Sequence, residues 1–225
     1  MFWMKDLFLH HVNLPYEAIS ITVSFLSQCT LNFLELFILY QCRSLNNNSF
    51  SGRIPTSIGR LSNLYWLDLA ENQLDGPIPV SDGNTPGLDM LVKAKHFHLE
   101  KRKFSGEIPS KHFSSNMVLK HLLLSNNVLT GNIPETLGSV TPLEVIRFIR
   151  NSLSGPVPSN LNNLVNVGKL YLSNNKLSGP IPNLTGMNTL QYVDMSNNSF
   201  DESDFPPWIS SLKYLTTISL RVIGF

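Results

Sequence analysis

The chain has 225 residues, which is enough for one sizeable hydrophobic core or for a short array of repeats. Its 17 basic and 16 acidic residues leave a net charge of +1, so there is no electrostatic reason to expect a nucleic-acid partner. The 14 prolines and 13 glycines indicate frequent turns. The two cysteines, Cys29 and Cys42, allow at most one disulfide, and free or buried thiols are an equally good interpretation.

Residues 1–43 are apolar but contain no clear targeting signal. Asp6 directly follows Lys5, and no small-residue cleavage site follows the most apolar run. Polar residues dilute the uncharged stretch from Ala18 to Leu34, which Glu35 ends short of the roughly 20 apolar residues that span a bilayer. We therefore expect an irregular or helical segment over the open end of the following domain, with a signal peptide or anchor as the less favoured alternative.

Residues 44–225 repeat with a period close to 24 residues. Counted from an asparagine, the typical unit has apolar residues at positions −11, −8, −5, −3 and +2, a glycine at +4 and an Ile-Pro pair at +6 and +7, although repeat one has Arg43 at a core position and repeat seven lacks the glycine. The clearest unit runs from Leu164 to Pro182 and has the pattern of a leucine-rich repeat. About seven repeats are anchored at positions 48, 72, 102, 127, 151, 175 and 198, and a truncated eighth begins at Leu212.

This pattern predicts an α/β repeat fold, a right-handed leucine-rich-repeat solenoid. Positions −6 to −2 should form one short strand per repeat, with positions −5 and −3 pointing inward. Stacked strands then make a parallel sheet on the concave face, opposite an irregular, 3₁₀ or short helical convex side. We expect each asparagine amide to bond backbone groups at the turn that leaves the strand, and each glycine to permit a tight bend.

Repeat three is the irregular unit of the array. It holds about six extra residues in the stretch SDGNTPG, and Arg102 stands at its asparagine position. Because arginine donates hydrogen bonds but does not accept them, we expect a looser or hydrated turn there.

The form LxGxIP recurs as FSGRIP, LDGPIP, FSGEIP, LTGNIP, LSGPVP and LSGPIP, and it resembles the extracellular repeats of plant receptor-like kinases. The segments FSSNMVL, PSNLNNLVNV and NLTGMNTLQYVDMSNNSFDESDFPPWISSL resemble the subfamily of these serine/threonine kinases that is usually numbered eight. The resemblance covers about residues 44–221. It implies a ligand-sensing region on the extracellular side of the plasma membrane, with a protein or peptide ligand and a co-receptor as candidate partners.

The kinase motifs of that family are missing from the chain. There is no glycine-rich phosphate loop, no VAIK-like lysine, no HRD and no DFG, so we expect no enzymatic activity and no cofactor. Membrane attachment is expected only through parts of a parent receptor. Two alternatives to a receptor fragment stay open: a stand-alone secreted repeat protein, such as a wall protein or an enzyme inhibitor, and a truncated fragment without function.

The solvent-facing columns at positions −6 and −4 supply the candidate binding residues. Aromatic side chains among charges are typical of interaction hot spots. The alternative is that these side chains are merely tolerated on an open sheet. We predict a protein or peptide contact at Trp66, Asp68, His96, His98, His121, Arg147, Lys169, Tyr171 and Tyr192.

Three of these residues are histidines on adjacent predicted strands. His96 and His121 share a column and are expected about 5 Å apart, while Asp68 shares the other column with His98. A metal site or a sensor of mildly acidic pH is one interpretation. We favour solvated neighbours and predict no metal.

Three sequons of the form N-x-S/T begin at Asn47, Asn183 and Asn197. They are candidate glycosylation sites if the protein is secreted.

Overall fold

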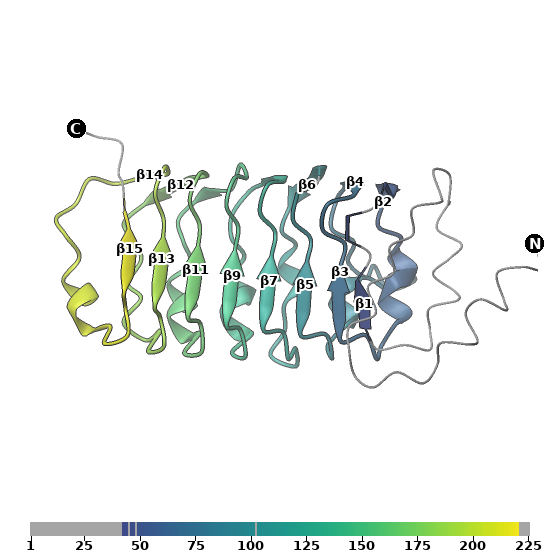
Figure 1. Cartoon of the computed structure of the whole chain (residues 1–225), viewed down its shortest axis with the longest axis horizontal. Helices are drawn as coiled ribbons and strands as arrows, with labels where there is room; N and C mark the ends of the chain where they lie inside the picture. The colour runs from purple at the N-terminus through teal and green to yellow at the C-terminus, as the bar shows by residue number, and fades with distance from the viewer. Residues whose placement is uncertain (1–41, 45, 48, 102, 221–225) are drawn as a thin grey trace, which may run out of the picture.

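The computed structural model describes residues 42–44, 46–47, 49–101 and 103–220 (Figure 1). The expectations for residues 1–41, including Cys29, and for Arg102 concern residues outside this part. In the described part the chain winds into a solenoid whose repeats stack side by side along one axis. No helix among these residues is long and apolar enough to cross a lipid bilayer.

One strand from each repeat joins a parallel sheet of eight strands along the concave face. The sheet has the order β1-β3-β5-β7-β9-β11-β13-β15, so every repeat pairs with its neighbours in sequence. This confirms the predicted strand of each repeat, including that of the eighth. The strands are β1 (Cys42–Ser44), β3 (Trp66–Asp68), β5 (His96–His98), β7 (His121–Leu123), β9 (Val145–Arg147), β11 (Lys169–Tyr171), β13 (Tyr192–Asp194) and β15 (Thr217–Ser219).

A second strand follows the asparagine in the first seven repeats, which the sequence pattern did not predict. Equivalent backbone groups of successive repeats lie side by side there, so pairing them satisfies their hydrogen bonds. A glycine with positive φ, +76° at Gly179, then lets the chain bend. These strands are β2 (Ser51–Arg53), β4 (Gln73–Gly76), β6 (Lys103–Glu107), β8 (Val128–Thr130), β10 (Ser154–Gly155), β12 (Lys176–Gly179) and β14 (Ser199–Phe200).

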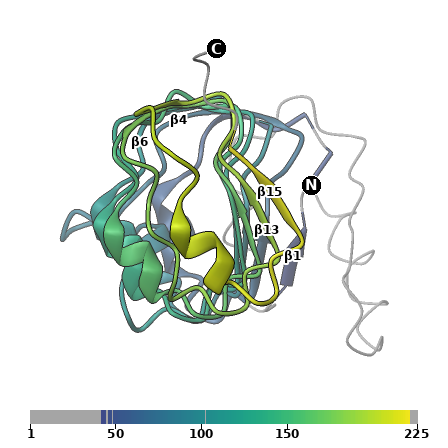
Figure 2. The same cartoon turned by 90° about the vertical axis from the view of Figure 1, so that its left-hand side faces the viewer.

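Short 3₁₀ helices form the convex side, as predicted, and Figure 2 shows them opposite the concave sheet. A proline of the repeat directly precedes each helix except η3 (Leu88–Met90). The carbonyl of this proline accepts the first hydrogen bond of the helix, as in Leu161 N to Pro158 O at 3.1 Å. The helices are η2 (Thr56–Arg60), η3 (Leu88–Met90), η4 (Ser110–His112), η5 (Glu135–Ser139), η6 (Ser159–Asn163) and η7 (Pro207–Ser211).

The core lies between the sheet and these helices, and it contains the apolar residues that the repeat pattern placed there together with residues of the 3₁₀ helices that the pattern did not include, such as Leu137 and Leu161. Leu170 and Leu172, at positions −5 and −3, are completely buried. Asn175 Nδ2 donates to the carbonyls of Leu172 and Phe148, at 3.0 and 2.9 Å. Its Oδ1 accepts a hydrogen bond from Leu153 N of the preceding repeat at 3.1 Å, so this asparagine links two repeats.

The residue before the asparagine position of each of the seven repeats adopts a left-handed conformation, with φ between 52° and 58°. Asparagine tolerates this backbone well, but three repeats place a charged residue there instead. These turns bring charged side chains to one edge of the concave sheet. The seven residues are Asn47, Glu71, Lys101, Asn126, Arg150, Asn174 and Asn197.

Candidate functional site

The parallel register of the concave sheet aligns the predicted binding residues in two columns. Trp66, His96 and His121 are neighbours in the −6 column, and Asp68 and His98 are neighbours in the −4 column. Further along, Lys169 pairs with Tyr192, and Arg147 pairs with Tyr171. The predicted residues therefore gather in a histidine-rich group at one end and an arginine–tyrosine group toward the other.

The histidine-rich group is a set of closely packed rings. The indole of Trp66 stacks on the imidazole of His96, with centroids 4.1 Å apart and planes inclined by 27°. The His96 and His121 rings meet edge to face at 4.5 Å, which confirms the spacing predicted from the sequence. The His98 ring lies 6.0 Å from that of His121. We call His96, His98 and His121 the histidine cluster.

Burial keeps the histidine cluster uncharged at neutral pH. Together with smaller effects of the neighbouring His121 and His98, it lowers the pKa of His96 to about 4. Burial also lowers the pKa of His98 and of His121, although the nearby carboxylates of Asp68 and Glu144, respectively, act in the opposite direction. These shifts oppose the charging at mildly acidic pH that a sensor of that pH range would need.

Two residues expected to face solvent are in fact buried. Asp68 and His96 are 7% and 8% exposed, because rings and turns of adjacent repeats cover them. The Asp68 carboxylate accepts hydrogen bonds from Ala70 N at 2.9 Å and from Asn46 Nδ2 at 3.1 Å. Asp68 therefore organises the turn after its strand instead of presenting a free carboxylate.

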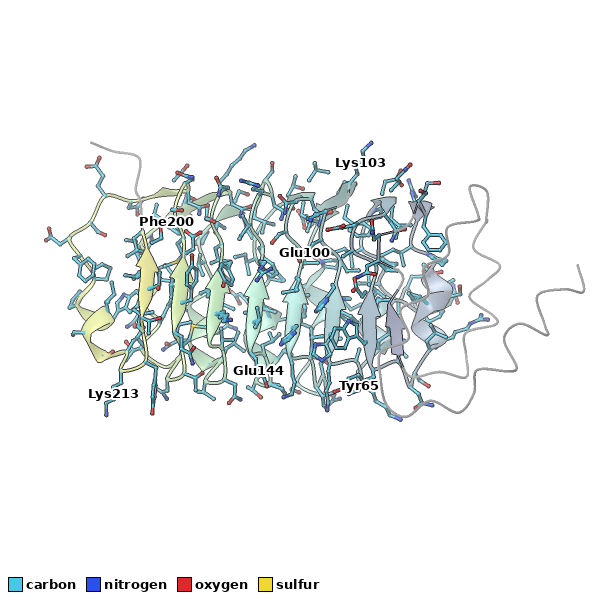
Figure 3. All side chains as sticks on the ribbon, in the orientation of Figure 1. Tyr65, Glu100, Lys103, Glu144, Phe200 and Lys213 are labelled. Carbon is cyan, nitrogen blue, oxygen red and sulfur yellow. The ribbon has the colours of Figure 1, made fainter. Side chains whose placement is uncertain are left out.

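The arginine–tyrosine group extends the aromatic surface across β9, β11 and β13. The guanidinium of Arg147 lies 4.9 Å from the centre of the Tyr171 ring, a cation–π arrangement. The Tyr171 and Tyr192 rings lie 4.6 Å apart, inclined by 33°. Arg147 Nη1 is 3.9 Å from the carboxylate of Glu100, which Figure 3 labels beyond the end of β5. These contacts hold three large side chains in place on the sheet.

A polar groove runs beside this group along the ends of the strands. It is built from positions −4, −2 and −1 of several repeats, and only position −4 was among the columns predicted to bind. The sequence contained a signal for the groove residues at −2, because position −2 lies on the same face of a strand as position −4. The groove is lined by Glu100, Lys101, Ser125, Asn126, Arg147, Ile149, Arg150, Tyr171, Ser173, Asn174 and Asp194.

The three sequon asparagines are all exposed. Asn47 and Asn197 occupy the left-handed turn position of their repeats. Asn183 Oδ1 accepts a hydrogen bond from Thr185 N at 3.0 Å in an exposed turn.

Comparisons with known proteins agree with this architecture. The Leucine Rich Repeat family matches residues 118–140, 166–187 and 189–212. A "probable leucine-rich repeat receptor-like protein kinase" of Arabidopsis thaliana is 61% identical over 138 residues, which are 61% of this chain and 15% of that protein. The chain thus spans a small part of the relative's length.

Solved structures of plant receptors have the same fold. The structure of PEPR1 with AtPEP1 has a TM-score of 0.75 at 32% identity, over 81% of this chain and 24% of that one. The Arabidopsis receptor kinase HAESA, with the peptide hormone IDA and the co-receptor SERK1, has a TM-score of 0.71 at 34% identity, over 80% and 29%. The chain consists largely of leucine-rich repeats and is homologous to the repeat regions of plant leucine-rich-repeat receptor-like kinases.

Proposed function

We propose that this chain is a protein- or peptide-binding scaffold and that its concave face, together with the polar groove, is the binding surface. The observation that carries the proposal is the arginine–tyrosine group beside the groove. Half-buried aromatic and arginine side chains in fixed positions are typical hot-spot residues, because little conformational entropy is lost when a partner covers them.

Arg147 has hydrogen-bonding capacity for a ligand. Its Nε is buried and has no hydrogen-bond partner in the part of the chain that the structure describes. Its guanidinium is held by Tyr171 on one side and Glu100 on the other. A ligand carbonyl or carboxylate that entered the groove would meet a guanidinium group that is already oriented.

The related receptors suggest the class of partner. HAESA was solved with a peptide hormone and a co-receptor, and PEPR1 with AtPEP1. By this similarity we propose a peptide ligand, a co-receptor as a second partner, and a place on the extracellular side of the plasma membrane. Glycosylation at Asn47, Asn183 or Asn197 belongs to the same proposal. It assigns binding, not catalysis, to this chain.

Selection from a random peptide library tests the proposal. Peptides enriched on the wild-type chain are titrated against the double variant Arg147→Ala, Tyr171→Ala and against Lys213→Ala, an exposed control away from the groove. We expect the double variant to lose at least tenfold in affinity, since hot-spot truncations cost about 2 kcal/mol or more, and Lys213→Ala to bind normally. Selected peptides that bind both variants as well as the wild type would contradict the proposal.

A further inference from the structure

The concave sheet brings three imidazoles to one place on adjacent strands. His96 and His98 lie two residues apart on β5 and so point to the same face, while His121 of β7 is the register partner of His96. One ring nitrogen from each of the three lies within 4.8 Å of the others. We propose that the histidine cluster binds a divalent first-row transition-metal ion, with Zn²⁺ as the ion that best fits three imidazole ligands.

Two of the imidazoles have a ring nitrogen that is unpaired in the described part of the chain. His96 Nδ1 and His98 Nε2 are buried and without a hydrogen-bond partner among the described residues. Buried polar atoms are normally paired, because an unpaired one costs about 1–3 kcal/mol. Coordination to a metal would use such nitrogens as electron-pair donors. His98 and His121 remain half-buried, which leaves a route by which an ion reaches them.

The geometry requires only a small adjustment. Zinc–nitrogen bonds of about 2.0–2.1 Å in a tetrahedral site place the ligand nitrogens about 3.4 Å apart. The nitrogens of the cluster, at most 4.8 Å apart, therefore need to approach by about 1.4 Å at their widest pair, a movement that ring rotation supplies. Three protein ligands leave a fourth position for water or for an atom of a bound partner.

Two carboxylates lie close to the histidine cluster. The Asp68 carboxylate lies 4.0 Å from His98 Nδ1, close to the position from which carboxylates orient histidine ligands. Glu144 adds a second negative charge near His121, against the positive charges of Lys120, Arg147 and Lys169.

Imidazole ligands select the class of ion. Zinc, copper and nickel accept nitrogen ligands readily, whereas magnesium and calcium require oxygen. None of the three histidines lines the polar groove, so the site is distinct from it, and its occupancy does not depend on the proposed peptide ligand.

Zinc titration of the whole, untagged chain tests the inference. After treatment with a chelator, the protein is titrated with ZnCl₂ by calorimetry, and Co²⁺ is used in parallel because its visible absorption reports four-coordinate binding. The variants His98→Gln and His121→Gln remove single ligands from half-buried positions. The control is the double variant His10→Gln, His11→Gln, which removes the one adjacent histidine pair in the sequence.

We expect one ion per chain, an affinity at least tenfold lower in each cluster variant, and unchanged binding in the His10→Gln, His11→Gln control. Circular dichroism of each variant establishes that it is folded. If folded cluster variants bind zinc like the wild type, if only the control loses binding, or if the wild type takes up no ion, the inference is overturned.

Discussion

The Trp66 indole and the His96 imidazole form a stacked pair, with centroids 4.1 Å apart, although the two residues belong to different repeats. The register of β3 and β5 places them side by side, and the indole covers one face of the imidazole. This contact contributes to the burial that lowers the pKa of His96 to about 4.

We expect Trp66→Ala to raise the pKa of His96 by about one unit or more, because water then solvates the imidazolium. The measurement is an NMR titration of the histidine ring protons in metal-free buffer. Tyr171→Ala, which removes a ring from the other group on the same sheet, serves as the control and should leave His96 unchanged. A His96 pKa that stays near 4 in Trp66→Ala would show that the indole is not the source of the burial.

The asparagines that link successive repeats, which we call the asparagine ladder, predict a large loss of stability at Asn175, a residue that does not line the polar groove. Asn175→Ala removes three donated hydrogen bonds and leaves the Leu153 N–H without its acceptor. We expect the free energy of unfolding to fall by about 2–4 kcal/mol, measured by urea denaturation. Asn188→Ala, at an exposed turn in the same part of the chain, should change it by less than about 0.5 kcal/mol. Equal effects of the two variants would refute a structural role for the ladder.

In repeat three the opposite substitution, which introduces the missing asparagine, is expected to raise stability. In the neighbouring repeats an asparagine accepts from the backbone N–H at position +2 of the preceding repeat, as Asn127 does from Phe104 at 3.2 Å. By the same pattern, Arg102→Asn supplies an acceptor for Leu74 N–H and a second donor to the Leu69 carbonyl. We expect a gain of about 1–2 kcal/mol in the free energy of unfolding.

Lys103→Asn makes a comparable change at the adjacent exposed position and should give no gain. Thermal and urea denaturation measure the free energy of unfolding of both variants. If Arg102→Asn is no more stable than the wild type, the ladder does not extend through repeat three in the way that the other repeats suggest.

The burial of His112 predicts how the free energy of unfolding depends on pH. Its ring is buried against Phe97 and Phe113, and burial lowers its pKa to about 4, although Asp89 acts in the opposite direction. In the unfolded chain a histidine takes up its proton near pH 6.5. Between about pH 6.5 and 4 the unfolded state therefore binds more protons than the folded state, and stability falls as the pH is lowered.

The loss attributable to His112 is about 3 kcal/mol between pH 7 and pH 4. His112→Leu removes this group, so the difference in unfolding free energy between wild type and variant should change by that amount over the same range. Denaturant titrations at several pH values measure the difference, in which the other titrating groups cancel. Parallel curves for the two proteins would mean that His112 is not buried in its neutral form.

The repeat pattern was sufficient to predict the solenoid, its concave strands and its core. The residue types of Leu170, Leu172 and Asn175 recur at fixed positions in successive repeats. Each position meets a local physical requirement, because a strand alternates its two faces and a buried turn must pair its polar groups. Because each repeat contacts mainly its neighbours, a one-dimensional pattern is enough to specify the stacking.

Other features depended on which residues came to lie beside one another in adjacent repeats. The burial of His96 and Asp68 arises from rings and turns that adjacent repeats supply, so no single repeat reveals it. The polar groove likewise combines positions −4, −2 and −1 of several repeats. Spacing along the chain predicted the scaffold, whereas the environment of each side chain was decided by packing between repeats, because burial and charge interactions depend on distance in space.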